Sequence, residues 1–187
     1  MSRFGYGETG SVFVIDRRAA VSEVPGLDPR RKRIGLAVAG DGTIYAAYYE
    51  GRGERGAVST LGLAGAERDV MPGLKKPIGV SVIGEWLFAS DQETGQIARC
   101  RLPRCEGTDV FASVAGADLL ASDRAGTLYV GTKDGDVYRI VAGGGSERWA
   151  TGLGRVRGIA VDSAGGRVFL ATKQDGRSAI RVLPLPK

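Results

Sequence analysis

Gly-Thr-Leu-Tyr-Val-Gly-Thr-Lys-Asp-Gly-Asp-Val-Tyr-Arg-Ile-Val, residues 126–141, is the stretch that decides the fold. It contains an apolar run at Leu128–Val130, a polar turn at Lys133–Gly135, and alternating apolar and polar residues from Val137 to Ile140. An Asp-Gly pair between two such runs favours a tight turn, because glycine adopts positive φ without steric cost. The stretch therefore predicts a β-hairpin.

The composition is that of a soluble globular domain. The chain has 187 residues, 43% of them hydrophobic and 25% charged, and its 30 glycines separate short apolar runs as turns do in an all-β protein. No apolar run approaches the ~20 residues that cross a membrane. The first residues also lack the apolar segment of a secretory signal, so the chain is either cytosolic or a mature or truncated form.

The first strand of the hairpin recurs along the chain. Aromatic residues occupy the same place in each copy, at Tyr45, Phe88, Tyr129 and Phe169, with spacings of 43, 41 and 40 residues. A period of about 40–45 residues is typical of propeller blades built from four strands each. Phe4 precedes Gly10 by the six residues that separate Tyr129 from Gly135, so we expect a further anchor there.

Other strands surround each anchor in a fixed order. A strand rich in small residues precedes it, at residues 34–38, 78–82, 118–122 and 157–161. A third strand follows, at 57–61, 96–102, 136–141 and 178–183, and a more polar outer strand comes next, at 68–71, 108–113 and 147–151. The N-terminal region fits as a third strand at 11–16 and an outer strand at 20–24.

These repeats predict an all-β fold, a β-propeller of four-stranded antiparallel blades. We expect about five blades, three full and two partial, in a single domain over residues 1–187. The blade segments are about 1–27, 28–76, 77–115, 116–155 and 156–187. A closed five-bladed ring and an incomplete six- or seven-bladed ring both fit this count, and we favour the incomplete ring. No window shows a sustained helical period free of glycine.

Two cysteines, Cys100 and Cys105, lie in the sequence Cys-Arg-Leu-Pro-Arg-Cys, and the chain has no histidine. Two thiols without histidine do not complete a usual structural zinc site. The spacing allows either a small disulfide across a turn, with Pro103 helping the chain reverse, or two free thiols in a reducing cytosol. A disulfide would indicate an oxidising compartment.

The repeats resemble the YWTD/NHL-like group of β-propellers, including secreted bacterial repeats of that type. Residues 157–162, Arg-Gly-Ile-Ala-Val-Asp, resemble the inner-strand motif, and residues 77–82 match its beginning. Residues 87–91, Leu-Phe-Ala-Ser-Asp, resemble the Tyr-Trp-Thr-Asp strand, whereas Lys133 and Lys173 depart from its final aspartate. Six-bladed relatives need roughly 250 residues at this period, so this chain is shorter than such a ring.

The resemblance extends to the cysteines. Ile97–Cys100 with Cys105 following is similar to secreted bacterial propeller repeats that carry a Cys-x4-Cys pair after the third strand. The resemblance implies a Cys100–Cys105 disulfide and an extracellular or periplasmic location, with a cytoplasmic location left open.

Net charge is +5, and the densest basic cluster is Arg30-Arg31-Lys32-Arg33. Such a tetrad can contact phosphate or an acidic partner, but charge runs more often form a solvated loop, which is what we expect here. No motif for stacking RNA bases and no helix-turn-helix pattern accompanies it, so we expect no nucleic-acid partner.

Loops that join the second and third strands, and loops between blades, surround one mouth of a propeller, where the resemblance implies that ligands bind. This places a set of polar and aromatic side chains at a candidate binding surface, although solvated turns carry such residues too. The candidate binding residues are Tyr49, Glu50, Asp91, Glu93, Lys133, Asp134, Lys173 and Asp175, with Tyr48, Arg52 and Gln92 beside them.

The repeats and the resemblance suggest two alternative functions. We favour a non-catalytic binding or scaffold propeller with no catalytic residue and no cofactor, which presents this mouth to a protein, peptide or glycan. An oligomer or additional blades would complete its ring. The alternative is a gluconolactonase-like hydrolase that uses Ca²⁺ or another divalent cation, with ligands partly outside this chain.

The residues weigh against the hydrolase in two ways. Without histidine, Ser-His and Cys-His catalytic pairs are excluded. Asp91 is the carboxylate expected at the ligand mouth, whereas Asp41, Asp123 and Asp162 fall in turns at the opposite mouth. There we expect them to hydrogen-bond turn backbone.

Overall fold

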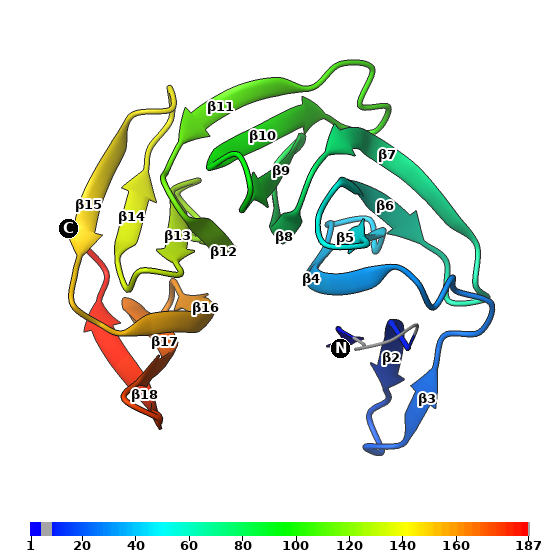
Figure 1. Cartoon of the computed structure of the whole chain (residues 1–187), viewed down its shortest axis with the longest axis horizontal. Coiled ribbons are helices and arrows are strands. Elements are labelled where there is room, and N and C mark those ends of the chain that lie inside the picture. Colours follow the sequence, from blue (N-terminus) through cyan, green and yellow to red (C-terminus); the bar gives the residue numbers. More distant parts are fainter. Residues whose placement is uncertain (5–8, 187) are drawn as a thin grey trace.

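The computed structural model describes residues 1–4 and 9–186, and eighteen β-strands lie within them (Figure 1). The first sheet contains β1 (Ser2–Arg3), β2 (Ser11–Ile15) and β3 (Val21–Glu23). The second contains β4 (Lys32–Val38), β5 (Ile44–Glu50), β6 (Arg55–Leu61) and β7 (Glu67–Leu74). The third contains β8 (Pro77–Ile83), β9 (Trp86–Asp91), β10 (Gln96–Arg101) and β11 (Asp109–Ser113). The fourth contains β12 (Ala117–Ser122), β13 (Leu128–Thr132), β14 (Val137–Ile140) and β15 (Ser146–Ala150), and the fifth contains β16 (Arg155–Asp162), β17 (Arg167–Gln174) and β18 (Arg177–Pro184).

The five sheets are blades of a β-propeller. In each, consecutive strands pair antiparallel, and β4, β8, β12 and β16 lie innermost (Figure 1). Three blades have four strands and two have three, which confirms the predicted fold class. The blades form an arc, with the first and the last blade on either side of an opening (Figure 1).

Apolar side chains from adjacent blades share each core. Phe88 and Ile97 of the third blade pack in one cluster with Leu120 of the fourth. Tyr129 of the fourth blade packs in the next cluster with Leu170 of the fifth. Removing this apolar surface from water supplies about 25 cal/mol per Å², so contact between blades stabilises each one.

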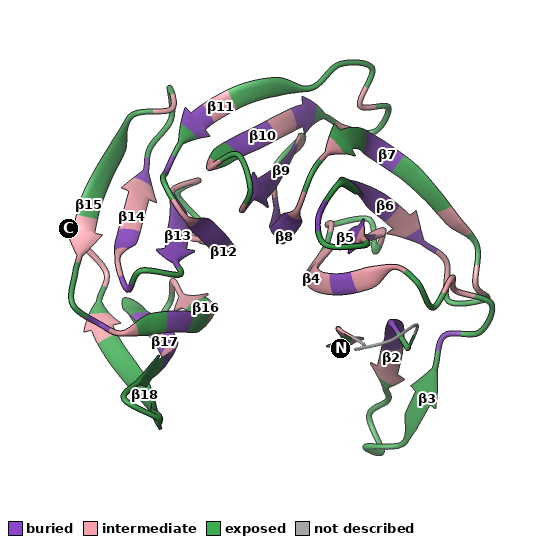
Figure 2. Ribbon diagram, in the orientation of Figure 1, coloured by how far each residue is buried: buried purple, intermediate pink, exposed green. Residues whose placement is uncertain are grey.

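Position in the arc decides how far each aromatic anchor is buried. Tyr45, Phe88 and Tyr129 are buried, whereas Phe169 is only half-buried. Phe169 lies in the last blade, where β18 is exposed along most of its length (Figure 2). Ile180 of β18 is 68% exposed. Within the described residues, no further blade packs against the anchor of the last blade.

The expected solvated loop at Arg30–Arg33 is wrong for Arg33. Strand β4 begins at Lys32, and the Arg33 side chain is fully buried. Its Nη2 lies 2.7 Å from Glu67 Oε2, and its Nη1 donates to the carbonyl oxygens of Gly10 and Asp28 at 3.3 and 3.0 Å. Arg33 thus ties the first blade to the second.

Arg31 belongs to the same network, while Arg30 lies outside it. The Arg31 guanidinium stacks 4.1 Å above the Tyr48 ring and pairs with Glu67 and Asp69 at 3.1 Å. Arg30 is 67% exposed and pairs with its near neighbour Asp28. The density of charge in the sequence does not distinguish the buried arginines from the exposed one. The acidic partners of Arg31 and Arg33 lie more than thirty positions away in sequence.

The Cys100–Cys105 disulfide is formed, as the resemblance implied. Cys100 ends the buried part of β10, and Cys105 lies in the loop before β11, at the mouth opposite the candidate binding loops. Within the described residues, no helix is long and apolar enough to cross a membrane.

Removal of this disulfide will lower the free energy of unfolding by about 2 kcal/mol, because a short loop is no longer closed in the unfolded chain. Urea denaturation of Cys105→Ala against wild type measures the difference. Dithiothreitol is the control: it should lower the midpoint of the wild type to that of the variant and leave the variant unchanged. Equal midpoints in all four conditions would contradict the prediction.

Candidate functional site

A pocket of about 360 Å³ opens at the mouth where the β9–β10 loop and the loops between blades meet. Each of the inner strands β4, β8, β12 and β16, which face the centre of the arc in Figure 1, supplies at least one lining residue. Its walls come from all five blades, and the lining residues are Phe4, Ile34, Tyr49, Lys76, Ile78, Gln92, Asp118, Arg155 and Arg157. We call it the axial pocket.

Each inner strand contributes a side chain near its first residues. Ile34 comes from β4, Ile78 from β8 and Asp118 from β12. In β16, Arg155 and Arg157 are exposed while Val156 between them is buried against the fourth blade. Both arginines line the pocket, and Arg157 lies at a β-bulge, where the pairing with β17 shifts register between Val156 and Gly158.

The charge of the axial pocket is predominantly positive. Among the described residues that line it, Lys76, Arg155 and Arg157 face one carboxylate, that of Asp118, which is 7% exposed. Burial raises the pKa of Asp118, and the three cations together with a hydrogen bond from Gln92 oppose that rise. Among the described residues, neither arginine forms an ion pair or a side-chain hydrogen bond, and both interact electrostatically with Asp118.

Aromatic and apolar side chains complete the walls. The rings of Phe4 and Tyr49 lie 6.0 Å apart, centroid to centroid. The amino groups of Lys32 and Lys76 lie 5.6 and 5.5 Å from the Tyr49 ring centre, within range of cation–π attraction. Tyr49 was predicted as a binding residue, and it is the one member of that set that lines the axial pocket.

Asp91 lies beneath this mouth and is 2% exposed. Its carboxylate accepts hydrogen bonds from the backbone N–H groups of Lys75, Lys76 and Glu93 at 2.8, 3.1 and 3.1 Å. Asp91 therefore fixes the segment that carries Lys76 and the start of the β9–β10 loop. Direct contact between Asp91 and a ligand stays a prediction.

The other predicted residues lie around the mouth and outside the axial pocket. Glu50 pairs with Arg55 at 2.5 Å. Exposed positions are held by Glu93, Lys133, Asp134, Lys173 and Asp175. Their part in binding also stays a prediction.

Sequence reasoning missed most of the pocket, because inner strands were interpreted as packing elements only. One signal was present: Arg157 stands where the YWTD/NHL-like inner-strand motif has another residue in its lead-in. Asp118 has a similar signal, since a carboxylate there interrupts an otherwise apolar strand.

A cation site does not fit this pocket. Hard divalent cations need several oxygen ligands that converge, and the described lining residues offer one carboxylate among three positive side chains. Among the described residues, no three histidine, cysteine, aspartate or glutamate side chains are grouped to hold a metal.

The three aspartates of the turns accept hydrogen bonds from turn backbone, as predicted. Asp41, Asp123 and Asp162 accept from the backbone N–H groups of Thr43, Thr127 and Gly165 at 2.9, 2.9 and 2.8 Å. The backbone bonds lower the pKa of Asp41 and, with help from Arg167, that of Asp162. These side chains shape the opposite mouth.

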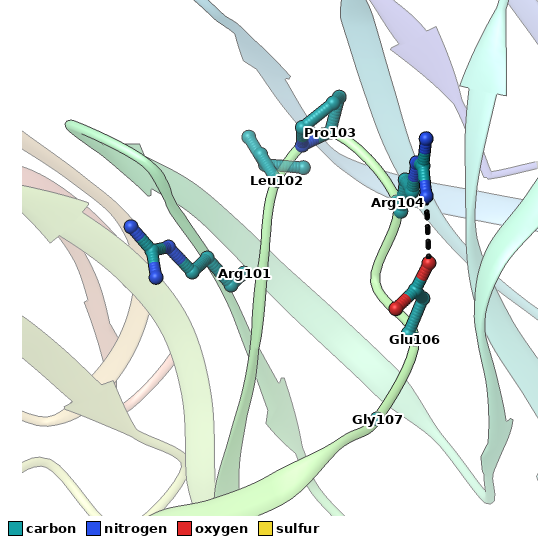
Figure 3. Close-up of a pocket in the computed structure, with 6 residues that line it drawn as sticks. All are labelled: Arg101, Leu102, Pro103, Arg104, Glu106 and Gly107. Atoms are coloured by element: carbon teal, nitrogen blue, oxygen red, sulfur yellow. Dashed lines mark hydrogen bonds and ion pairs between the residues drawn. The ribbon is translucent and has the colours of Figure 1, made fainter.

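A second hollow, of about 290 Å³, lies at the disulfide loop (Figure 3). Its walls come from residues 101–104, 106 and 107 of one loop, and Arg104 pairs with Glu106 at 3.3 Å. Both of these side chains are more than 70% exposed. A hollow made by one exposed loop is a weaker candidate than a pocket built by five blades.

Comparison with known proteins gives the fold. The family model described as strictosidine synthase-like, N-terminal, matches residues 120–140, which run from the second half of β12 to the end of β14 in the fourth blade. No curated protein sequence matches the chain.

Solved structures match over nearly the whole chain. A chain in a nidogen/laminin complex has a TM-score of 0.75 and 16% identity, covering 92% of this chain and 74% of that one. A gluconolactonase from Xanthomonas campestris has a TM-score of 0.75 and 19% identity, with coverage of 96% and 66%. The calcium-binding protein regucalcin from Agrobacterium tumefaciens has a TM-score of 0.70 and 14% identity, with coverage of 93% and 68%. At these identities the likeness shows one thing: the chain is a β-propeller that spans about two thirds to three quarters of these chains' lengths.

Proposed function

We propose that this chain is a non-catalytic binding propeller that holds a glycan, peptide or protein ligand at the axial pocket. The observation that carries the proposal is the convergence of Lys76, Arg155 and Arg157, from separate segments, on one pocket with aromatic and apolar walls. Pockets of 300–1,000 Å³ with a few placed polar groups are typical ligand sites.

The chemistry of the pocket supports binding over catalysis. The chain has no histidine, and the pocket has no serine, threonine or cysteine nucleophile. The disulfide supports an oxidising compartment, and we propose an extracellular or periplasmic location on that ground.

A hydrolase is the second candidate, and Asp118 is the observation that favours it; a metal-dependent form would need cation ligands from outside this pocket. A buried carboxyl with a raised pKa at the centre of an arc is suited to hold or transfer a proton. Solved neighbours include a gluconolactonase and a calcium-binding protein, which shows that the same fold accommodates both.

Two measurements on the purified chain separate these candidates. We expect calcium titration by calorimetry to give no stoichiometric binding, and we expect δ-gluconolactone to hydrolyse at the buffer rate with or without calcium. The physical reason is the excess of positive side chains around the one carboxylate of the pocket. Calcium-dependent turnover that disappears in Asp118→Asn would overturn the binding proposal, and Asp109→Asn, an exposed carboxylate on β11, is the matched control.

A further inference from the structure

We infer that the axial pocket binds a small hydroxylated carboxylate, such as a sugar acid, with Arg155 and Arg157 on its carboxylate and Asp118 on its hydroxyls. The inference rests on the proposed binding function and names the ligand class of that site.

The arginines give the first part of the argument. Arg155 and Arg157 lie on either side of the buried Val156 in β16, and both side chains line the axial pocket. Both are exposed at the pocket, and no carboxylate of the described residues lies within ion-pair distance of either. A guanidinium group presents a planar fork of donors that matches a carboxylate in two parallel hydrogen bonds. Two such groups with Lys76 form a site for an anion.

Asp118 makes the site selective among anions. Its carboxylate is nearly buried in the same pocket, and Gln92 donates a hydrogen bond to it. A ligand hydroxyl can donate to this carboxylate, whereas a second negative charge on the ligand would be repelled by it. The pocket therefore favours one carboxylate with neighbouring hydroxyls over a phosphate dianion.

The remaining walls fit the apolar part of such a ligand. The pocket is also lined by Ile34, Ile78 and the Phe4–Tyr49 ring pair. Carbon-bound hydrogens of a sugar ring can pack on these surfaces, and the volume of about 360 Å³ accommodates a monosaccharide. Free sugar acids and the acidic ends of glycans share this chemistry.

Titrations followed by amide NMR shifts test the inference with glucuronate, glucose and inorganic phosphate as probes. We expect saturable glucuronate binding with shifts at residues 75–78, 92–95 and 154–158. Glucose and phosphate should bind at least tenfold more weakly, since glucose lacks the carboxylate and phosphate meets Asp118. Arg157→Gln should weaken glucuronate binding about tenfold or more, the usual effect of losing a charged hydrogen bond. Arg124→Gln, an exposed arginine at the opposite mouth, is the control and should leave the affinity unchanged.

The outcomes are distinguishable. A tetrasaccharide with a terminal glucuronate that binds more tightly than glucuronate supports a glycan end as the source, and equal affinity supports the free acid. Glucose or phosphate binding as tightly as glucuronate, shifts confined to the disulfide loop, or no glucuronate binding at 20 mM would each overturn the inference. None of these three would by itself overturn the binding function, which fails only on metal-dependent turnover.

Discussion

Replacement of Arg33 by methionine will lower the free energy of unfolding by about 3–5 kcal/mol, the usual cost of breaking a buried ion pair from one side. The Glu67 side chain is 9% exposed and would be left without its closest cationic partner, which lies 2.7 Å away. The Gly10 carbonyl oxygen would lose the hydrogen bond from Arg33, and the Asp28 carbonyl oxygen would keep only the longer bond from the Arg31 backbone N–H at 3.3 Å. Urea denaturation followed by circular dichroism measures the change.

Arg30, in the same basic cluster, provides a control for the Arg33→Met variant. Arg30→Met removes an equal charge from an exposed ion pair, and exposed pairs contribute about 0–1 kcal/mol. The double variant Arg33→Met, Glu67→Leu should recover part of the loss, because it leaves no buried charge unpaired. If Arg30→Met and Arg33→Met destabilise equally, Arg33 does not join the first two blades in the way the structure describes.

The fold was predictable because a propeller repeats its pattern. Tyr45, Phe88 and Tyr129 each fall at the centre of a blade, and the spacing between them indicates the number of strands per blade without knowledge of any contact. Hairpin turns such as Lys133–Gly135 are equally local, since the turn residues themselves determine the backbone conformation.

The site was less predictable because it is assembled across blades. Lys76 and Arg157 meet at one pocket although about eighty residues separate them in sequence, and no local pattern marks that meeting. The composition of the loops led to the prediction of Glu93, Lys133 and Lys173, whereas most of the residues that line the pocket lie near the beginning of an inner strand. The inner strands must pack closely against one another and also present side chains at the axis. The sequence pattern indicated the close packing and did not indicate which side chains face the axis.

Close packing at the axis explains the glycines of the inner strands. A Cβ atom at Gly79 of β8 would lie 2.5 Å from Leu120 N and 2.9 Å from Asp118 O of the next blade. It would also lie 2.8 Å from Ser90 Oγ, whose hydroxyl donates to the Asp118 carbonyl. At Gly35 of β4, a Cβ atom would overlap the carbonyl oxygen of Ile78 in the same manner. Adjacent blades approach one another here through backbone, which has no freedom to move aside.

Gly79→Ala should therefore lower the free energy of unfolding by about 3 kcal/mol, the upper part of the range for overpacking, because the blocking atoms are backbone. The equivalent position of the last blade, Gly158, meets only the Ala171 methyl group at 3.1 Å, so Gly158→Ala should cost less than about 1 kcal/mol. Gly40→Ala meets nothing within 4 Å and is the neutral control.

Urea midpoints of the three variants give the comparison, and the difference between Gly79 and Gly158 is its informative part. It arises because a blade follows β8 and none follows β16 in this arc. Ser90→Ala added to Gly79→Ala should not restore stability, since Leu120 N still blocks the new methyl group. A large loss at Gly158, equal to that at Gly79, would mean that another surface covers the last blade in solution, and the exposed side of Phe169 would then be buried too.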